Sequence, residues 1–374
     1  MYQTKIEISN FRNILNTTIE FSPNINCFYG ENAQGKTAIL EAIYYLLKGK
    51  SFRKSVTFKE VLNVDASRAL IQIAANFVEK FGEEKKRILS ENFEQKILKK
   101  NDLIVKNHLD GTEIYLFNPF DTYLFFSSRA KRIDWLDELI GLADKEYIKN
   151  IKQNNKILKS KNFLITKIKQ NKNIIKSGLH QLKIYNQMQA KASELVLRKR
   201  DFYLEIIEKK IKELFIELYG EKIDFKIKYY CTFGVSRSEE EICQKLDVNL
   251  NNLNESSGTH LDDIEIYLNH FLATEQASLG QQKIAFFALN LGGLEAIRDY
   301  CQGEDKKFPT MLLIDDISSE LDSRKWKTLI QYLNRTNLQV FLTTANENFL
   351  NSLKLNSNAT IFNVRDGFVT AFAE

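Results

Sequence analysis

The sequence predicts an α/β fold whose sheet-forming segments come from both ends of the chain, with a mainly helical segment inserted between them. Three observations support this prediction. A glycine-rich loop lies between an apolar strand and an apolar helix within residues 25–48. The hydrophobic period becomes helical over residues 129–220. An apolar strand that ends in two aspartates, residues 311–316, follows near the C-terminus.

Size and composition fit two domains, or one large domain with an insertion. The chain has 374 residues, of which 44% are apolar and 27% are charged. It has no run of about 18 uncharged apolar residues, and the N-terminus does not resemble a signal peptide. The four cysteines lack C-x-x-C spacing, which argues against a disulfide framework or a zinc site. We therefore expect a cytoplasmic protein.

The positive charge is concentrated in one part of the chain. Residues 145–200 contain fifteen Lys and Arg but only two Glu, a local net charge of +13 within a total of +5. Such asymmetry is typical of a protein that touches a polyanion with one region. The alternative is a lysine-rich helix that is merely solvated, and the sequence leaves both open.

The N-terminal segment predicts alternating strands and one buried helix. Residues 4–8 alternate polar and apolar side chains, as in a half-buried strand. "INCFYG" reads as a buried strand that ends at the glycine-rich loop. The helix Lys36–Lys48 is apolar nearly all round, so we expect it to be buried, with Gly49 as its C-terminal cap. Strand-like runs such as "ALIQIAANFV" and "EIYLF" continue to about residue 117.

The middle segment predicts a helical arm. One apolar stripe runs along its second half, while residues 149–176 are polar and suit a solvent-exposed helical hairpin. "DFKIKYYC" alternates like a strand, and the Asn- and Ser-rich stretch "NLNNLNESSG" reads as a link back to buried α/β structure. The stripe consists of Leu204, Ile207, Ile211, Leu214, Phe215 and Leu218.

The stretch "GENAQGKT" completes the phosphate-binding pattern G-x-x-x-x-G-K-[ST] with Gly30, Gly35, Lys36 and Thr37. Backbone N–H groups of such a loop converge on phosphate oxygens, and the following helix adds the positive end of its dipole. Lys36 would supply charge to the β- and γ-phosphates, and Thr37 would supply a hydroxyl ligand for Mg²⁺. The strand before the loop and the helix after it make a chance match a minor alternative.

The stretch "MLLIDDISSELD" offers the carboxylates that hydrolysis needs. An apolar strand would deliver Asp315 and Asp316 at its C-terminal edge, where α/β sheets place ligands. Asp315 would hold the metal through water, and Asp316 would orient or deprotonate the attacking water. Alternatively this is an ordinary buried strand followed by an acidic cap, with Asp322 or Ser323 capping the next helix.

A second anion site is predicted in "QASLGQQKIAFFALNLGG". Ser278 and Gly280 precede a long apolar helix, so a hydroxyl and bare amides gather at its N-terminus. Because one nucleotide needs only one such loop, a second site makes sense if it reaches a partner subunit's nucleotide. The alternative is a capped core helix.

In this order, the loop, S-x-G-Q, the D-D pair and S-x-E-L-D resemble ABC-type ATPases of DNA maintenance. More narrowly, the whole chain resembles the RecF family of bacterial recombination mediators. The matching stretches are "ISNFRN", "YGENAQGKT", "LEAIYYLLKGKSFR", "SLGQQKIAFFALNL" and "LLIDDISSELD" and, more loosely, "FNPFDTYLFFSSRAKRIDWLD" and "GTHLDD".

The resemblance implies an SMC-like ATPase head with a short helical arm. The head would comprise residues 1–128 and 258–374, and the arm residues 129–257. It implies a weak, Mg²⁺-dependent and DNA-dependent ATPase that forms an ATP-dependent homodimer. Such proteins bind DNA at gaps or stalled forks and act with RecO and RecR to load RecA.

The resemblance also assigns site residues. Arg12 would touch the nucleotide phosphates, and Asp322 would belong to the loop that contacts the opposite subunit. Ser278, Gly280 and Gln281 would meet the γ-phosphate of that subunit. The ATP cradle would consist of Gly30, Glu31, Asn32, Ala33, Gln34, Gly35, Lys36, Thr37 and Ala38.

Some positions depart from the family pattern. Ala33 replaces a usual Gly, so we expect a negative φ there, and Ala38 replaces a usual Asn. Leu261 and Thr259 stand where Arg and Pro are usual, which puts the polar task of that Arg in doubt. A transporter-like switch His after "VFLTTAN" is missing, so Thr343 or Thr344 would sense the γ-phosphate.

Two other functions compete with an ATP-gated DNA clamp. One is the ATP-binding subunit of a transporter, against which the basic arm, the D-D pair and the missing His argue. The other is a DNA-binding adaptor that binds ATP without turnover. The adaptor remains an alternative because Asp316 stands where transporters usually have Glu, and the shorter Asp side chain reaches less far toward the attacking water.

Overall fold

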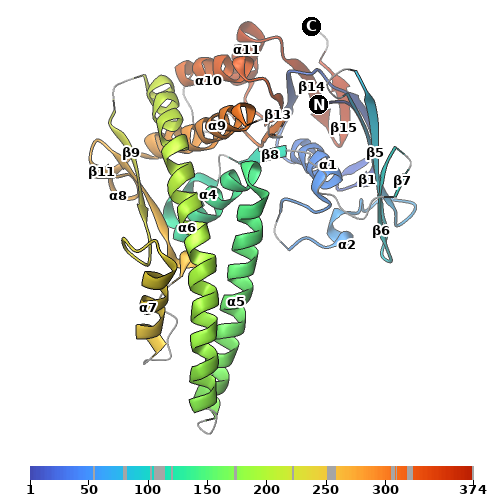
Figure 1. Ribbon diagram of the computed structural model, residues 1–374. Coiled ribbons are helices and arrows are strands. Elements are labelled where there is room, and N and C mark those ends of the chain that lie inside the picture. The colour runs from blue at the N-terminus through green and yellow to red at the C-terminus, as the bar shows by residue number, and fades with distance from the viewer. Residues whose placement is uncertain are drawn as a thin grey trace. The chain divides into compact units, whose positions relative to one another are not determined.

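The computed structural model contains two compact units, formed by Met1–Asp121 with Phe308–Glu374 (unit 1) and by Thr122–Lys307 (unit 2). Figure 1 shows its elements. No helix in the described part of the chain is long and apolar enough to cross a membrane. The structure describes the whole chain except residues 54, 79–81, 102, 105–113, 119–120, 172–174, 221–222, 251–257, 305–307, 309, 318–322 and 373–374.

An antiparallel sheet forms one layer of unit 1, in the order β2-β1-β4-β5-β6-β7. The predicted strand at residues 4–8 lies within it, and the inward-facing Ile6 and Ile8 are fully buried. Its strands are β1 (Tyr2–Phe11), β2 (Ile14–Glu20), β4 (Ile71–Val78), β5 (Glu84–Glu91), β6 (Lys96–Lys100) and β7 (Leu103–Ile104).

A second sheet of unit 1 takes strands from both chain ends, in the order β15-β14-β3-β13-β12-β8. Neighbours from β14 to β8 are parallel, and β15 returns antiparallel beside β14. This confirms the predicted α/β fold built from both ends. The strands are β3 (Ile25–Tyr29), β8 (Ile114–Phe117), β12 (Met311–Ile314), β13 (Gln339–Thr344), β14 (Thr360–Arg365) and β15 (Phe368–Ala371).

Helix α1 (Lys36–Lys48) shares one apolar core with both sheets. Its apolar side chains are buried nearly all round, as predicted, and Gly49 ends the helix with φ 71° and an N–H donated to Tyr45 O. The remaining helices of unit 1 are α2 (Phe58–Val61), α10 (Ser323–Arg335) and α11 (Glu347–Asn356).

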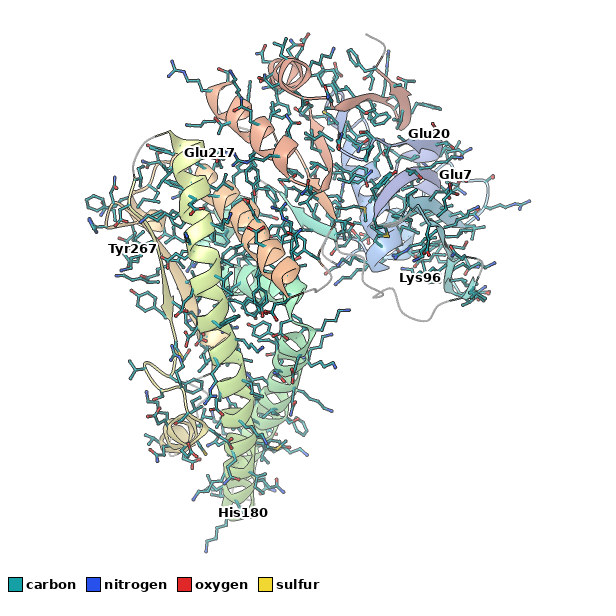
Figure 2. All side chains as sticks on the ribbon, turned by 45° about the horizontal axis from the view of Figure 1, so that its top comes forward. Glu7, Glu20, Lys96, His180, Glu217 and Tyr267 are labelled. Carbon is teal, nitrogen blue, oxygen red and sulfur yellow. The ribbon has the colours of Figure 1, made fainter. Side chains whose placement is uncertain are left out.

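Unit 2 contains the predicted helical hairpin, formed by α5 (Lys145–Gln170) and α6 (Ile175–Tyr219) (Figure 1). Figure 2 shows His180 near the turn of this hairpin and Glu217 near the opposite end of α6. The other helices are α3 (Thr122–Ser127), α4 (Arg129–Ala143), α7 (Glu239–Leu250), η3 (Thr259–Leu261), α8 (Ala273–Gln276) and α9 (Leu279–Gly303).

A small antiparallel sheet of unit 2 joins β9 (Phe225–Tyr230), β10 (Asp263–Leu268) and β11 (Phe271–Leu272). Helix α9 packs closely on α6 at Gly292. A Cβ added to this glycine would lie only 2.9 Å from Ile211 Cα, so the close approach requires glycine. Residues 258–307, which we assigned to the head, thus form one compact unit with the helical arm. A head can consist of two lobes, so the division into head and arm stays a prediction.

Candidate nucleotide-binding site

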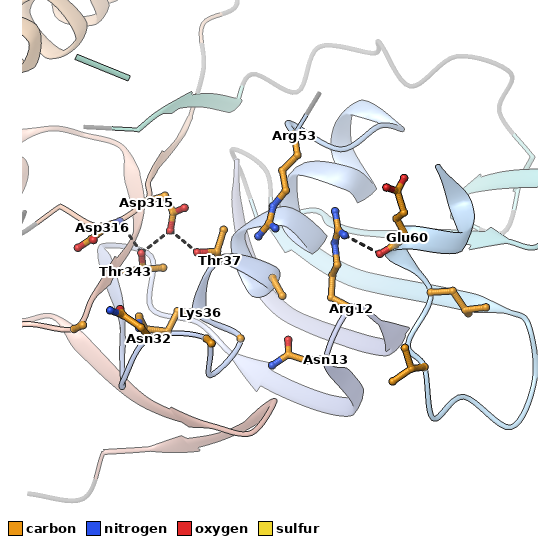
Figure 3. Close-up of a pocket in the computed structure, with 16 residues that line it drawn as sticks. Arg12, Asn13, Asn32, Lys36, Thr37, Arg53, Glu60, Asp315, Asp316 and Thr343 are labelled. Atoms are coloured by element: carbon orange, nitrogen blue, oxygen red, sulfur yellow. Dashed lines mark hydrogen bonds between the residues drawn. The ribbon is translucent and has the colours of Figure 1, made fainter. Parts of the chain in front are cut away.

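A cavity of about 720 Å³ opens over the glycine-rich loop in unit 1 (Figure 3). Its walls come from the β1–β2 turn, the loop itself, the segment between α1 and β4, and the ends of β12 and β13. The lining residues are Arg12, Asn13, Asn32, Ala33, Gly35, Lys36, Thr37, Ala38, Arg53, Glu60, Leu62, Val64, Asp315, Asp316, Thr343 and Ala345.

The loop keeps its shape through neighbours from the C-terminal strands. A Cβ at Gly30 would lie 2.3 Å from Val364 O, so no larger residue fits there. The turn between β14 and β15 holds Gln34: the Asp366 N–H donates to its Oε1 (2.6 Å) and the Gly367 N–H to its O (2.9 Å). Both chain ends therefore contribute to the shape of the glycine-rich loop.

The expectation of a negative φ at Ala33 is wrong. Ala33 has φ 65°, in the left-handed region, which costs an L-residue roughly 1–2 kcal/mol. The turn is fixed on its C-terminal side by Gln34 and by Gly35, which caps α1 with φ 111°. These contacts hold the turn in place despite the strain at Ala33.

Lys36 is turned back onto its own loop. Its Nζ donates to Gly30 O (2.7 Å) and Glu31 O (2.6 Å). Burial lowers the pKa of Lys36, while the nearby charges of Asp316 and Asp315 act in the opposite direction. A bound phosphate would replace these carbonyl oxygens as the partner of the Lys36 ammonium. A hydrogen bond to a charged phosphate oxygen is stronger than one to a neutral carbonyl.

The predicted metal ligands meet at the ends of β12 and β13. Thr37 Oγ1 and Thr343 Oγ1 both donate to Asp315 Oδ1, at 2.9 Å and 2.8 Å (Figure 3). Thr343 Oγ1 also accepts the Asp316 N–H at 2.7 Å, and Asp316 has φ 54°. Thr37 and Asp315 lie 278 residues apart in the sequence, and the parallel strands bring their side chains together in space. Thr344 Oγ1 instead accepts the Asn346 N–H.

A hydroxyl and a carboxylate are oxygen donors that Mg²⁺ prefers. Within the described residues, no group of three or more His, Cys, Asp or Glu side chains could hold a metal ion. Mg²⁺ is usually bound by few protein oxygens together with substrate phosphates, and Thr37 and Asp315 fit that pattern.

Sequence reasoning found only one member of a cluster that consists of two arginines and a buried glutamate. Arg12, which we predicted, donates to Glu41 through Nε (3.0 Å) and Nη2 (2.6 Å). Arg53 Nε lies 3.2 Å from the same carboxylate, and Ser51 Oγ donates to it at 2.6 Å. Glu41, Ser51 and Arg53 all fall in "LEAIYYLLKGKSFR", but no spacing rule gave them a role.

The N-terminus of α9 lies in unit 2 and forms a capping box. Ser278 Oγ accepts the Gln281 N–H (3.3 Å), and Gln281 Oε1 accepts the Ser278 N–H (2.9 Å). At Gly280, the nearest atom to a built Cβ is Ser278 Oγ at 4.0 Å. The capped-helix alternative is thus present, and contact with another subunit's γ-phosphate stays a prediction. Asp322 lies outside the described residues.

The "GTHLDD" stretch binds two buried arginines of unit 2. Asp262 accepts from Arg200 Nη1 (2.8 Å), and Asp263 accepts from Arg132 Nε (2.8 Å) and Nη2 (2.9 Å). Asp262 and Arg200 are almost fully buried. These pairs join β10 to α4 and α6, so the two aspartates have a structural task in this chain.

Known proteins resemble this chain over nearly its whole length. The AAA domain family matches residues 5–265. The DNA replication and repair protein RecF of Thermoanaerobacter pseudethanolicus is 30% identical over 363 residues, covering 94% of this chain and 96% of that protein. The protein of the same name from Clostridium tetani is 30% identical over 384 residues, covering 98% and 99%.

Solved structures agree. A recombination mediator protein RecF-ATPrS of the RecFOR pathway superposes with a TM-score of 0.79 at 27% identity, covering 100% of this chain and 98% of that one. An SMC head bound to the C-winged helix domain of ScpA superposes with a TM-score of 0.59 at 15% identity, covering 100% and 97%, and supports the fold alone. By sequence and by structure, the chain belongs to the RecF family of DNA replication and repair proteins.

Proposed function

We propose that this protein is an ATP-dependent DNA-binding ATPase of recombinational repair. The proposal depends on one observation: Thr37 and Thr343 are hydrogen-bonded to Asp315, and all three line the same cavity as Lys36. This is the donor set that a Mg²⁺–nucleoside triphosphate requires. The relationship to RecF proteins favours DNA repair over a transporter subunit, and a related structure is described as RecF-ATP.

In the proposed site, Lys36 leaves the carbonyls of Gly30 and Glu31 and binds the β- and γ-phosphates. Thr37 and Asp315 would hold Mg²⁺, which supplies positive charge against the phosphate oxygens when bound. Asp316 orients the attacking water. Thr343 bonds to both Asp315 and the Asp316 N–H, so it is well placed to sense the γ-phosphate.

The proposed DNA contact is a lysine face on α5. Lys149, Lys152, Lys156 and Lys159 follow one another at spacings of three and four residues, and all are exposed. Lys167 continues the same face, with its Nζ 4.5 Å from the Phe163 ring centroid. Residues 149 to 167 extend over about 27 Å of helix, long enough to follow several phosphates of a nucleic acid.

The proposed assembly is a homodimer formed with ATP, in which Ser278, Gly280 and Gln281 meet the γ-phosphate bound by the other subunit. The dimer would act as a clamp on DNA at gaps or stalled forks and help RecO and RecR to load RecA in the cytoplasm. A related structure is described as a mediator in the RecFOR pathway. Hydrolysis would reset the clamp.

Hydrolysis measured with and without DNA, under single-turnover conditions, tests the proposal. We expect slow, Mg²⁺-dependent hydrolysis that DNA accelerates, and sedimentation that shows a dimer with ATP and a monomer with ADP. ATP binding without turnover would instead identify a DNA-binding adaptor. Absence of ATP binding would refute the proposal altogether.

A further inference from the structure

The carboxylate of Glu41 is completely buried beneath the nucleotide cavity. It lies on α1, one helical turn after Thr37, and its side chain has 0% exposure. It accepts hydrogen bonds from Arg12 and Ser51 and pairs with Arg53. A buried carboxylate is strongly destabilising unless it is paired and hydrogen-bonded, and here three side chains meet that need.

Glu41 does not line the cavity, but both of its arginine partners do. Arg12 is firmly held: besides its two bonds to Glu41, its Nη1 donates to Glu60 O at 2.7 Å and its backbone N–H to Val61 O at 2.7 Å. The backbone N–H of Arg53 donates to Ser51 Oγ (2.9 Å), but its guanidinium has only the 3.2 Å contact with Glu41 among the described residues, and 46% of the side chain is exposed. One guanidinium is fixed, and the other is able to move toward a ligand.

The arginines stand at one end of the cavity. Figure 3 shows Arg12 and Arg53 on one side of Thr37, and Asp315, Asp316 and Thr343 on the other. If the γ-phosphate faces Asp316, the arginines face the end of the phosphate chain that ATP and ADP share. Two guanidinium groups at one site repel each other, and the carboxylate between them offsets this repulsion.

We infer that Glu41 is a positioning residue that holds Arg12 and Arg53 toward the α-phosphate end of the bound nucleotide. The inference rests on the proposed ATP site. Because Glu41 acts through the shared end of the nucleotide, it sets the affinity for ATP and ADP equally. Hydrolysis takes place at the other end of the cavity, so its rate is independent of Glu41.

Glu41→Gln tests the inference, because it keeps the shape of the side chain and removes its charge. We expect the dissociation constants of ATP and ADP to rise by the same factor, about 10- to 100-fold, as when supporting groups of a metal site are removed. The rate of hydrolysis at saturating ATP should not change. Equilibrium titration with each nucleotide and Mg²⁺ measures the first, and steady-state kinetics the second.

Glu91→Gln is the matched control. Glu91 also contacts α1, accepting from Tyr45 OH (2.6 Å) and pairing with Lys96 Nζ (2.7 Å), but it serves no arginine of the cavity. We expect it to lower the melting temperature without changing either dissociation constant. Arg53→Gln, at an exposed side chain, provides a second variant if Glu41→Gln fails to fold. It should weaken ATP and ADP binding equally.

A variant with Arg12→Gln and Arg53→Gln identifies the route of the effect. Adding Glu41→Gln to it should cause no further loss of affinity, since the coupling would already be removed. An undiminished loss in that background would overturn the inference, as would equal affinities for Glu41→Gln and Glu91→Gln. If the unaltered protein binds no ATP, the proposed function itself fails. Normal binding and hydrolysis with an inert Glu41→Gln would refute only the role of Glu41.

Discussion

The two predicted phosphate-binding regions differ in how much of the site their own unit supplies. In unit 1, strands from both chain ends bring Lys36, Asp315 and Thr343 to a cavity of about 720 Å³. In unit 2, Ser278 and Gln281 bond to each other, and the adjacent Leu279 is 67% exposed. The first region has cation, hydroxyl and carboxylate around one space, whereas the second is a helix N-terminus that would need another molecule to complete a site.

This difference shows what a motif can predict by itself. The P-loop pattern specifies groups that converge on a ligand within one chain, so its geometry can be checked there. The S-L-G-Q pattern contains the residues of a helix cap, and a cap has the same geometry whether or not it also binds phosphate. Substitutions that separate capping from ligand contact are therefore the informative ones.

The largest effect is expected from Lys36→Met. It should abolish nucleotide binding, because the β- and γ-phosphates lose their cationic partner. The loop loses two hydrogen bonds but also a partly buried charge, and because these effects oppose each other, stability should change by less than the about 1.5–3 kcal/mol usual for one hydrogen bond to a charged group. Calorimetric titration with ATP and thermal unfolding measure the two quantities.

Lys48→Met is the matched control, because it makes the same change in the last turn of the same helix. It should leave ATP affinity unaltered. Unchanged ATP affinity in Lys36→Met would show that the glycine-rich loop is not the phosphate cradle.

Ser278→Arg should block dimerisation and hydrolysis while sparing ATP binding by the monomer. The large cation would occupy the space in which the partner's γ-phosphate is expected. Sedimentation with a non-hydrolysable ATP analogue measures the dimer. ATP carries the γ-phosphate oxygens and ADP lacks them, so the unaltered protein should dimerise only with ATP.

Ser278→Ala separates the loss of the Ser278 hydroxyl from the bulk and charge that Ser278→Arg adds. It removes the cap and should cost about 1 kcal/mol of stability, but it adds no bulk. If Ser278→Arg and Ser278→Ala both dimerise as well as the unaltered protein, the helix N-terminus serves only as a cap. If Ser278→Arg fails to bind ATP as a monomer, Ser278 belongs to its own subunit's pocket.

Asp316→Asn should leave ATP and Mg²⁺ binding intact and slow hydrolysis by about 10²- to 10⁴-fold, the usual contribution of a positioned acid or base. Only the group facing water is neutralised, so trapped ATP should prolong the dimer. Single-turnover kinetics measure the rate. Asp366→Asn is a suitable control, since Asp366 supports Gln34 through its backbone N–H. Equal rates in the two variants would move the catalytic role to another residue.

Much of the fold and the core of the site could be predicted from local pattern. The helix Lys36–Lys48 agrees with the structure at both ends, because an apolar periodic run is bounded by two glycines. Thr37 and Asp315 were predicted as metal ligands because each lies in its own motif, and the structure brings their side chains into contact although 278 residues separate them. A strand and the loop that follows it constrain such residues regardless of distance along the chain.

The failures come from contacts that no local pattern contains. The φ of Ala33 is set by the β14–β15 turn through Gln34, from the other end of the chain. Glu41 lies 29 residues from Arg12, and the burial that makes it important depends on packing. In each case the deciding neighbour is brought by the fold.

The smallest effect is expected from charge reversal on the lysine face of α5, which tests whether the arm or the head binds DNA. Reversing Lys152, Lys156 and Lys159 to Glu should lower the steepness with which DNA binding falls as salt rises, because each phosphate contact contributes a log–log slope of about −0.9 on duplex. Loss of three contacts would thus reduce the slope by about 2.7.

The matched control reverses three exposed lysines of unit 1, Lys59, Lys86 and Lys99. Fluorescence anisotropy over a salt series should show a smaller slope for the arm variant only. An unchanged slope in the arm variant would mean that the lysine face of α5 is merely solvated. A reduced slope in the control alone would place DNA on the head.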